Sequence, residues 1–262
     1  MNRITTLFIA TALTACSSQN KHDENSQSLV KDSISQSIKA NESKPEEETL
    51  VSTYDDPAED LDSHKSSLKE LSDSSVFSTI HAELLAKLSK NHQSYFDSKP
   101  EYNLLYLVSG DLFRNKTDGN AFILYDKKNV RVSILTFDQS TNKYAELYRD
   151  IKVVSKLGTA NCNYGAHGTL DYQFANEIIF QGEFLIKKPK TFIEYTKCKI
   201  VEIKKDKDFI LESGCIAKNF ADAENSPSLC ITTSFAYNNW ECLTYDKSKD
   251  TFVIFYGQAF AD

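Results

Sequence analysis

The sequence predicts a mainly β domain, an antiparallel β-sandwich or open barrel, with one N-terminal amphipathic helix and a disordered tether in front. Phe8 and Tyr54 are the only aromatic residues before Val76, so the residues that can build a core lie behind that point. This part contains many short runs of branched and aromatic residues separated by turn sequences. No helical pattern of about 10–15 residues separates these runs, which argues against a parallel sheet.

The first residues of the chain indicate a signal peptide, residues 1–15. Arg3 precedes an apolar run at residues 4–15, which is shorter than the roughly 20 residues that a membrane-spanning helix needs. The run ends in LTAC (residues 13–16), which resembles the lipobox of bacterial lipoprotein precursors. The resemblance implies cleavage before Cys16, a lipid on its thiol and a location in the cell envelope. Because Ser17 rather than Asp follows, the family rule implies the outer membrane, facing the periplasm or the cell surface.

Residues 16–72 are expected to form a disordered acidic tether that begins at the lipidated Cys16. Residues 17–72 hold six Lys against thirteen Asp or Glu, a net charge of -7, and their scattered apolar residues cannot offset the entropy of the chain. The remaining 190 residues, 73–262, hold 23 Lys or Arg against 24 Asp or Glu. The acidity therefore belongs to the tether, and no basic excess indicates nucleic-acid binding.

One helix is expected to open the folded domain, residues 73–262. Residues 72–75 offer capping side chains, and a set of apolar residues at helical spacing follows. This set is Val76, Phe77, Ile80, Leu84, Leu85 and Leu88. The helix is expected to end near Asn91. His81 and His92 are interpreted as surface residues, because two histidines without a third ligand make a poor metal site.

Short β-strands are predicted after Pro100. Four of them lie at residues 102–109, 121–126, 130–137 and 143–149, separated by the turn sequences TDGN, DKKN and DQSTN. Five more are predicted at residues 177–187, 191–203, 208–213, 229–237 and 251–257. The later links are KKPK, KKDKD, a loop at residues 217–228, and NN with DKSKD. Links of this length favour an antiparallel arrangement.

Part of the domain resembles a family of bacterial envelope lipoproteins. SGDLFRNKTDGNAFILYDKKNVRVSILTFDQSTNKYAELYRDIKV (residues 109–153) looks like an FG-GAP or VCBS-like β unit, with a Gly-Asp step, an Asp/Asn/Gly-rich loop and hairpins. GTLDYQFANEIIFQGEFLI (residues 168–186) and DFILES (residues 208–213) are similar to the rest of such domains. The resemblance covers residues 76–213 and implies an architecture rather than an activity.

The loop at residues 111–120 is a candidate calcium site. An EF-type register ending at Asp118-Gly119 places Arg114 and Lys116 where calcium needs oxygen ligands. The loop is therefore interpreted as a turn in which Gly119 supplies a positive φ. The alternative is an irregular cation site at Asp111, Asn115 and Asp118. No cofactor is predicted.

One thiol and one imidazole lie close together in CNYGAHG (residues 162–168). Cys162 and His167 are a candidate nucleophile and base, with Asp171 as the orienting carboxylate. The sequence has no G-x-S-x-G, no H-E-x-x-H, no P-loop and no cysteine-protease signature. A loop with a structural cysteine is therefore the favoured interpretation.

Five cysteines remain after Cys16 is set aside: Cys162, Cys198, Cys215, Cys230 and Cys242. An oxidising compartment permits disulfides. The leading candidate pairs are Cys230–Cys242 and Cys198–Cys215, and Cys215–Cys230 is a competitor. Strand parity places Cys230 and Cys242 on one face, diagonally across a turn, and places Cys198 and Cys215 on opposite faces unless a bulge intervenes.

A lysine-rich hairpin is predicted at residues 187–207, which hold eight Lys against three acidic residues. The favoured interpretation is a sheet edge protected by lysines against aggregation. The alternative is a surface for anionic lipid, glycan or an acidic protein. Its candidate residues are Lys187, Lys188, Lys190, Lys204, Lys205 and Lys207.

Three functions follow in order of preference. The first is a lipid-anchored bacterial envelope protein whose β domain binds or scaffolds an envelope protein or a glycan without chemistry. The second is an inhibitor or immunity-type lipoprotein that protects against a periplasmic hydrolase or toxin. The third is a cysteine/histidine-dependent hydrolase. The membrane is expected as a partner through the N-terminal lipid, and nucleic acid is not.

Overall fold

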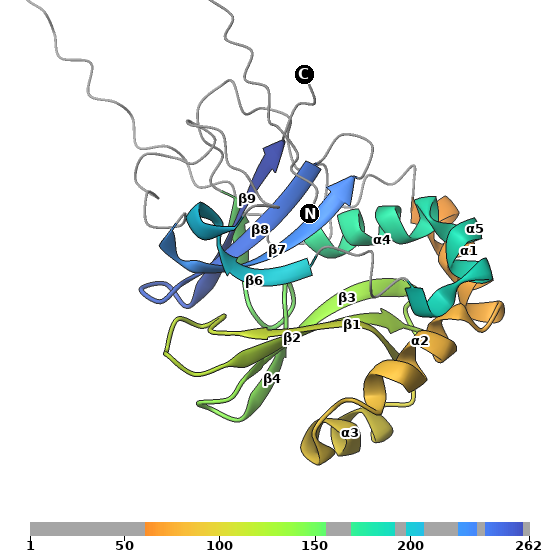
Figure 1. Cartoon of the computed structure of the whole chain (residues 1–262), viewed down its shortest axis with the longest axis horizontal. Helices are drawn as coiled ribbons and strands as arrows, with labels where there is room; N and C mark the ends of the chain where they lie inside the picture. Colours follow the sequence, from red (N-terminus) through yellow and green to blue (C-terminus); the bar gives the residue numbers. More distant parts are fainter. Residues whose placement is uncertain (1–60, 156–168, 192–197, 207–224, 235–238, 259–262) are drawn as a thin grey trace, which may run out of the picture. The chain divides into compact units, whose positions relative to one another are not determined.

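The computed structural model describes residues 61–155, 169–191, 198–206, 225–234 and 239–258 (Figure 1). Within these ranges the fold is mainly β, as predicted, with a four-stranded sheet, a five-stranded sheet and helices packed against them. The described strands form no closed barrel, so the two separate sheets correspond to the sandwich rather than the barrel.

Within the described residues, three helices precede the first strand, rather than the single predicted one. They are α1 (Leu61–Asp73), α2 (Val76–Leu85) and α3 (Lys90–Asp97). The prediction of one helix ending near Asn91 is wrong because Ser89 begins a new helix, where its side chain accepts a hydrogen bond from the N–H of His92.

The helix α1 lies in the segment that was predicted to be tether. Leu68 and Leu71 are three residues apart on one face of this helix, and both are buried. Ser75, at φ 68°, then turns the chain between α1 and α2. The folded domain therefore includes residues 61–72, and the predicted tether of residues 16–72 is too long. Two leucines among polar residues gave too weak a periodic signal.

The four-stranded sheet has the order β1-β2-β3-β4, and all its pairs are antiparallel. Its strands are β1 (Tyr102–Gly110), β2 (Gly119–Asp126), β3 (Arg131–Asp138) and β4 (Lys143–Glu146). The predicted strands at these places are confirmed, although the fourth ends three residues early. Val130 and Asn142 adopt φ near 53° just before β3 and β4, which closes the two hairpins at those turns.

The five-stranded sheet has the order β5-β9-β8-β7-β6. Its strands are β5 (Val153–Ser155), β6 (Cys198–Glu202), β7 (Pro227–Ser234), β8 (Asn239–Asp246) and β9 (Thr251–Gln258). The β5–β9 pair is parallel, and the other pairs are antiparallel. The strands predicted at residues 229–237 and 251–257 correspond to β7 and β9. Of the strand predicted at residues 191–203, residues 198–202 form β6, and residues 208–213 lie outside the described ranges.

Residues 177–187 are helical, so the strand predicted there is wrong. They belong to α4 (Leu170–Phe180) and α5 (Gly182–Lys187), which is followed by a 3-10 turn, η2 (Pro189–Thr191). Leu170, Phe174 and Ile178 recur every four residues and are all buried, which is the spacing of one helix face. This period begins before residue 177, where the predicted strand started.

The sheets and helices share one buried apolar cluster. The helix α4 contacts both β3 and β7, and β1 contacts β6, so the two sheets meet along the chain's core (Figure 1). Gly110 permits the close approach of β1 to β6, because a Cβ atom there would lie 2.9 Å from the Cβ of Ile200.

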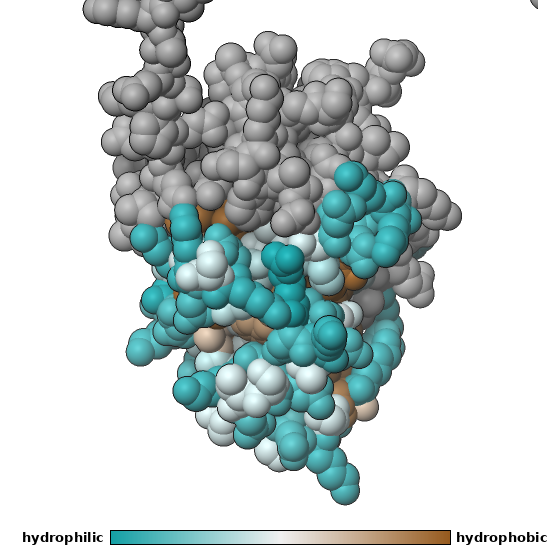
Figure 2. Space-filling view, turned by 90° about the vertical axis from the view of Figure 1, so that its left-hand side faces the viewer, coloured by the Kyte–Doolittle hydropathy of each residue, from teal (hydrophilic) through white to brown (hydrophobic). Residues whose placement is uncertain are grey.

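The side of the domain that lies on the left in Figure 1 is covered mainly by hydrophilic residues, with small hydrophobic areas between them (Figure 2). The short 3-10 turn η3 (Ile203–Lys205), which follows β6, lies on this side. Among the described helices, none has the length and apolarity that a membrane crossing requires.

Candidate functional site

The loop between β1 and β2, the candidate calcium loop, is closed by its own hydrogen bonds. Asp111 Oδ1 accepts hydrogen bonds from the N–H groups of Asn115, at 2.8 Å, and Lys116, at 3.0 Å. Arg114 and Lys116 have positive φ values of 54° and 65°. The predicted role of Gly119 is wrong. It lies in β2, and glycine is required there because a Cβ atom would lie 2.8 Å from the carbonyl oxygen of Phe137.

The same loop attaches the first sheet to the second. The ring of Phe113 meets the rings of Tyr245 and Phe252 edge-on, with centroids 5.2 and 5.8 Å apart. Arg114 Nη1 donates to the carbonyl oxygen of Tyr245 at 3.4 Å, and Leu112 is buried. The conformation of this loop is therefore explained by packing between the sheets rather than by a bound ion.

The three candidate cation ligands do not converge. Asp111 accepts backbone hydrogen bonds, and Asn115 Nδ2 donates to Asp138 Oδ1 at 3.1 Å. Asp118 is exposed. Across the described ranges, no group of three or more His, Cys, Asp or Glu side chains is placed to hold a metal ion.

Of the candidate nucleophilic set, only Asp171 lies in the described residues, and Cys162 and His167 lie outside them. Asp171 is fully buried in the first turn of α4. Its carboxylate accepts hydrogen bonds from the hydroxyl of Thr169 and from the N–H of Tyr172, and forms an ion pair with Arg149 at 3.8 Å. The carboxylate thus fixes the start of the helix and binds an arginine.

Arg149 belongs to a half-buried charged network that joins the strand ends of the first sheet to α4. Arg131 lies 3.5 Å from Asp126 and 3.3 Å from Glu146, and Arg149 also pairs with Glu146. Burial raises the pKa of the Glu146 carboxyl, and Arg131 opposes that shift. The network orients α4 on the sheet.

Sequence reasoning missed this network, although a signal for it exists. The chain has only four arginines, Arg3, Arg114, Arg131 and Arg149, against 26 lysines among its 30 basic residues. Arginine is the residue that suits buried and bidentate ion pairs, whereas lysine suits exposed surfaces. The arginines at 114, 131 and 149 all make structural contacts.

His81 and His92 are partly buried and hydrogen-bonded, so their interpretation as surface residues is wrong. His81 Nδ1 accepts a hydrogen bond from the N–H of Leu104 at 2.9 Å, where β1 bulges. His92 Nδ1 lies 2.5 Å from the hydroxyl of Tyr144, and its Nε2 accepts from Asn120 Nδ2 at 3.0 Å. Burial lowers the pKa of both imidazoles, and Lys127 lowers that of His81 further.

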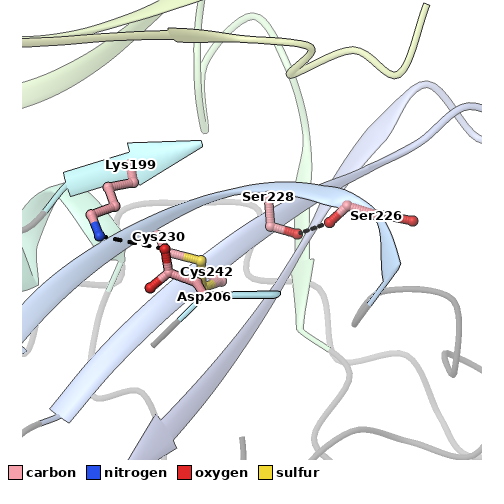
Figure 3. Close-up of a disulfide and its surroundings, with 6 residues drawn as sticks. All are labelled: Lys199, Asp206, Ser226, Ser228, Cys230 and Cys242. Carbon is pink, nitrogen blue, oxygen red and sulfur yellow. Dashed lines mark hydrogen bonds and ion pairs between the residues drawn. A yellow bond between two sulfur atoms is a disulfide. The ribbon is translucent and has the colours of Figure 1, made fainter. Parts of the chain in front are cut away.

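A disulfide joins Cys230 of β7 to Cys242 of β8 (Figure 3). The two residues are directly opposite in the strand register, rather than diagonal as predicted, with Cα atoms 4.1 Å apart. A bulge between Thr232 and Ser234 shifts the register near the turn and brings them opposite. Lys199 of β6 is the register partner of Cys230, and its Nζ lies 3.4 Å from Asp206 (Figure 3).

The other candidate disulfides are wrong. Cys198 is a buried, unbridged thiol, which excludes the Cys198–Cys215 pair. Cys230 is already bonded to Cys242, which excludes the Cys215–Cys230 pair. Cys198 is the register partner of Ile231 in β7, and Cys215 lies outside the described residues.

The described residues between 187 and 207 do not form the predicted lysine hairpin, and their lysines lie in separate places. Lys187 ends α5, and Lys188 and Lys190 follow it, whereas Lys204 and Lys205 lie in η3 on the opposite side of Figure 1. Helices α4 and α5 occupy the residues up to Lys187, and the strand β6 is followed directly by the short η3 turn. Lys207 lies outside the described ranges.

Two large hydrophobic side chains of the described residues are exposed, and they lie at the end of α4 and in α5. Phe180, the last residue of α4, is 77% exposed, and Ile186 of α5 is 48% exposed. A groove of about 710 Å³ lies nearby between α2 and η2. The groove is lined by Ser78, Thr79, Ala82, Glu83 and Lys190. We call α2, α5, η2 and the end of α4 together the α2–α5 face.

Comparison with known proteins adds no relative. No protein-family model, curated protein or solved structure matches the chain. The lipobox resemblance at Cys16 and the FG-GAP-like resemblance therefore stay predictions from the sequence. The function has to be argued from the geometry of this chain alone.

Proposed function

We propose that the protein is a lipid-anchored bacterial envelope protein whose β domain binds a partner without performing chemistry. The anchor is argued from LTAC at residues 13–16, in which Cys16 carries the lipid. Buried CH₂ groups contribute about 0.8 kcal/mol each, and more than one acyl chain holds a protein firmly at a membrane. The domain then stands on its acidic tether in the cell envelope, at the outer membrane.

The observation that carries the binding role is the exposure of Phe180. A large aromatic side chain that is 77% exposed and accompanied by Ile186 is typical of an interaction surface rather than of an inert one. The adjacent groove adds concave surface. Burying such a ring contributes about 1.5–3 kcal/mol, which is the scale of a binding hot spot.

The two alternative functions receive less support. A hydrolase built on Cys162 and His167 would use Asp171 as its orienting group, but this carboxylate already binds Arg149 and the start of α4. An inhibitor could plug a hydrolase with the lysine hairpin or with the loop at residues 217–228. The described residues do not form the hairpin, and most of the loop lies outside them. Partner binding requires neither feature.

Two measurements on intact cells test the proposal. Mass spectrometry of the mature N-terminus should find Cys16 as the first residue with acyl chains attached, and Cys16→Ala should release the protein from the membrane fraction. A photo-crosslinking amino acid at Phe180 should give a discrete adduct, and one at the exposed Gln139 serves as the matched control. An unmodified Cys16 refutes the anchor. A panel of surface positions that yields no adduct refutes the binding role.

A further inference from the structure

We propose that the α2–α5 face binds an acidic segment of a partner protein, with an apolar side chain of that segment against Phe180 and its carboxylates against the surrounding lysines. The inference rests on the proposed binding role and specifies its partner.

The apolar part of the face is produced by the helical period. The buried residues of α4 recur at Leu170, Phe174 and Ile178, which places Phe180 on the other side of the helix. The chain then turns at Gln181, and α5 buries Leu185 while it presents Ile186 to solvent. Phe180 and Ile186 are not part of the domain's core, so both side chains are available to a partner.

The groove favours a polypeptide over a bilayer. It runs between α2 and the η2 turn, and Ala82 leaves space in its wall. The hydroxyls of Ser78 and Thr79 donate to the carbonyl oxygen of Ser75, at 2.9 Å each, which holds them along α2. A concave surface of about 710 Å³ takes side chains of a protein segment, whereas a membrane presents a flat surface.

The charges favour an acidic segment. Glu83 is a single carboxylate that is shared by two ammonium groups, Lys87 at 3.2 Å and Lys190 at 3.8 Å. Glu183 pairs with Lys187 at 3.7 Å, and Lys188 adds a further positive charge. Across α2, α5 and the turns that follow them, four lysines therefore face two carboxylates, a net charge of +2. The folded domain, residues 73–262, has a net charge of only -1, so this face is a local excess of positive charge that complements an acidic segment.

Peptide selection on the full-length chain in detergent tests the inference. A random 16-residue library should yield peptides with an aromatic residue or leucine flanked by Asp or Glu. Fluorescence anisotropy with the selected peptides should show at least tenfold weaker binding to Phe180→Ser. The triple reversal Lys187→Glu, Lys188→Glu and Lys190→Glu should shift the selection toward basic peptides. Circular dichroism confirms that these exposed substitutions leave the fold intact.

Matched controls decide between the outcomes. Lys204→Glu with Lys205→Glu makes the same change on the opposite side of the domain and should leave peptide binding unchanged. Selection without an acidic bias, or equal binding by Phe180→Ser, overturns the inference. Binding of Cys16→Ser protein to phosphatidylglycerol vesicles, in place of peptides, also overturns it. Adducts in cells from other surface positions but not from Phe180 would leave the binding role standing and refute this face.

Discussion

Glu241 provides the sharpest test of the structure, because its carboxyl group is buried without compensation. It lies in β8 opposite Ile231, is 5% exposed, and its Oε2 has no hydrogen-bond partner. Burial raises the pKa of this carboxyl from 4.5 to about 8. Glu241→Gln removes the titration and keeps the shape of the side chain.

The sign of the effect follows from proton linkage. Below pH 4.5 the carboxyl is protonated in both the folded and the unfolded chain. As the pH rises from 4.5 to about 8, the unfolded chain releases this proton while the folded protein keeps it, so the wild-type stability falls. Each pH unit is worth about 1.36 kcal/mol, and the 2.5 units between pH 4.5 and pH 7 amount to about 3 kcal/mol.

Urea unfolding at pH 5, 6, 7 and 8, with the disulfide intact, measures this effect. The difference in unfolding free energy between Glu241→Gln and wild type should grow from below about 1 kcal/mol at pH 5 to about 3 kcal/mol at pH 7. The other titrating groups are the same in wild type and in Glu241→Gln, so their contributions to the unfolding free energy cancel in the difference. Glu202→Gln, a half-exposed position on β6 that pairs with Lys205, is the control and should show no such growth. Parallel pH profiles for Glu241→Gln and wild type would refute the burial argument.

Three further changes probe other contacts, each by urea unfolding. Arg149→Met should destabilise the fold by about 3 kcal/mol, because the fully buried carboxylate of Asp171 loses its ion pair with Arg149, whereas Glu146 keeps Arg131; a loss below about 0.5 kcal/mol would contradict this role. Gly110→Ala should lose about 1–3 kcal/mol through its clash with Ile200, and Ile200→Ala in the same chain should recover part of it. If the double variant loses the sum of the two single losses, the clash between residue 110 and Ile200 is excluded. Reducing Cys230–Cys242, which are 12 residues apart, should remove about 3 kcal/mol, and an unchanged midpoint would count against the bond.

The sequence was most informative where the structure depends on near neighbours. Strands β1 to β4 follow branched and aromatic runs between turn residues, and this signal is local. The Cys230–Cys242 disulfide was among the candidates because strand parity is also local, although the bulge that set its register was not foreseen. The helix α4 was missed because its period starts at Leu170, before the run that resembled a strand.

Local sequence patterns do not predict contacts between distant parts of the chain. His81 was interpreted as exposed because its acceptor role depends on Leu104, 23 residues away, at a bulge that no pattern announces. The α2–α5 face likewise combines Glu83 with Lys190. Five of the candidate lysines are exposed, and Lys207 lies outside the described residues. The division of the five between two sides of the domain depends on α5, a helix that takes the place of part of a predicted strand.

The β1–β2 connection has a consequence for how the domain unfolds. Surface loops between strands usually open independently and tolerate insertions. This one carries Phe113 into contact with Tyr245 and Phe252, more than 120 positions further along the chain. Separating the sheets would expose these rings to water, so the two layers melt as one cooperative unit. An affinity tag placed between Arg114 and Lys116 would loosen the whole domain rather than a single turn.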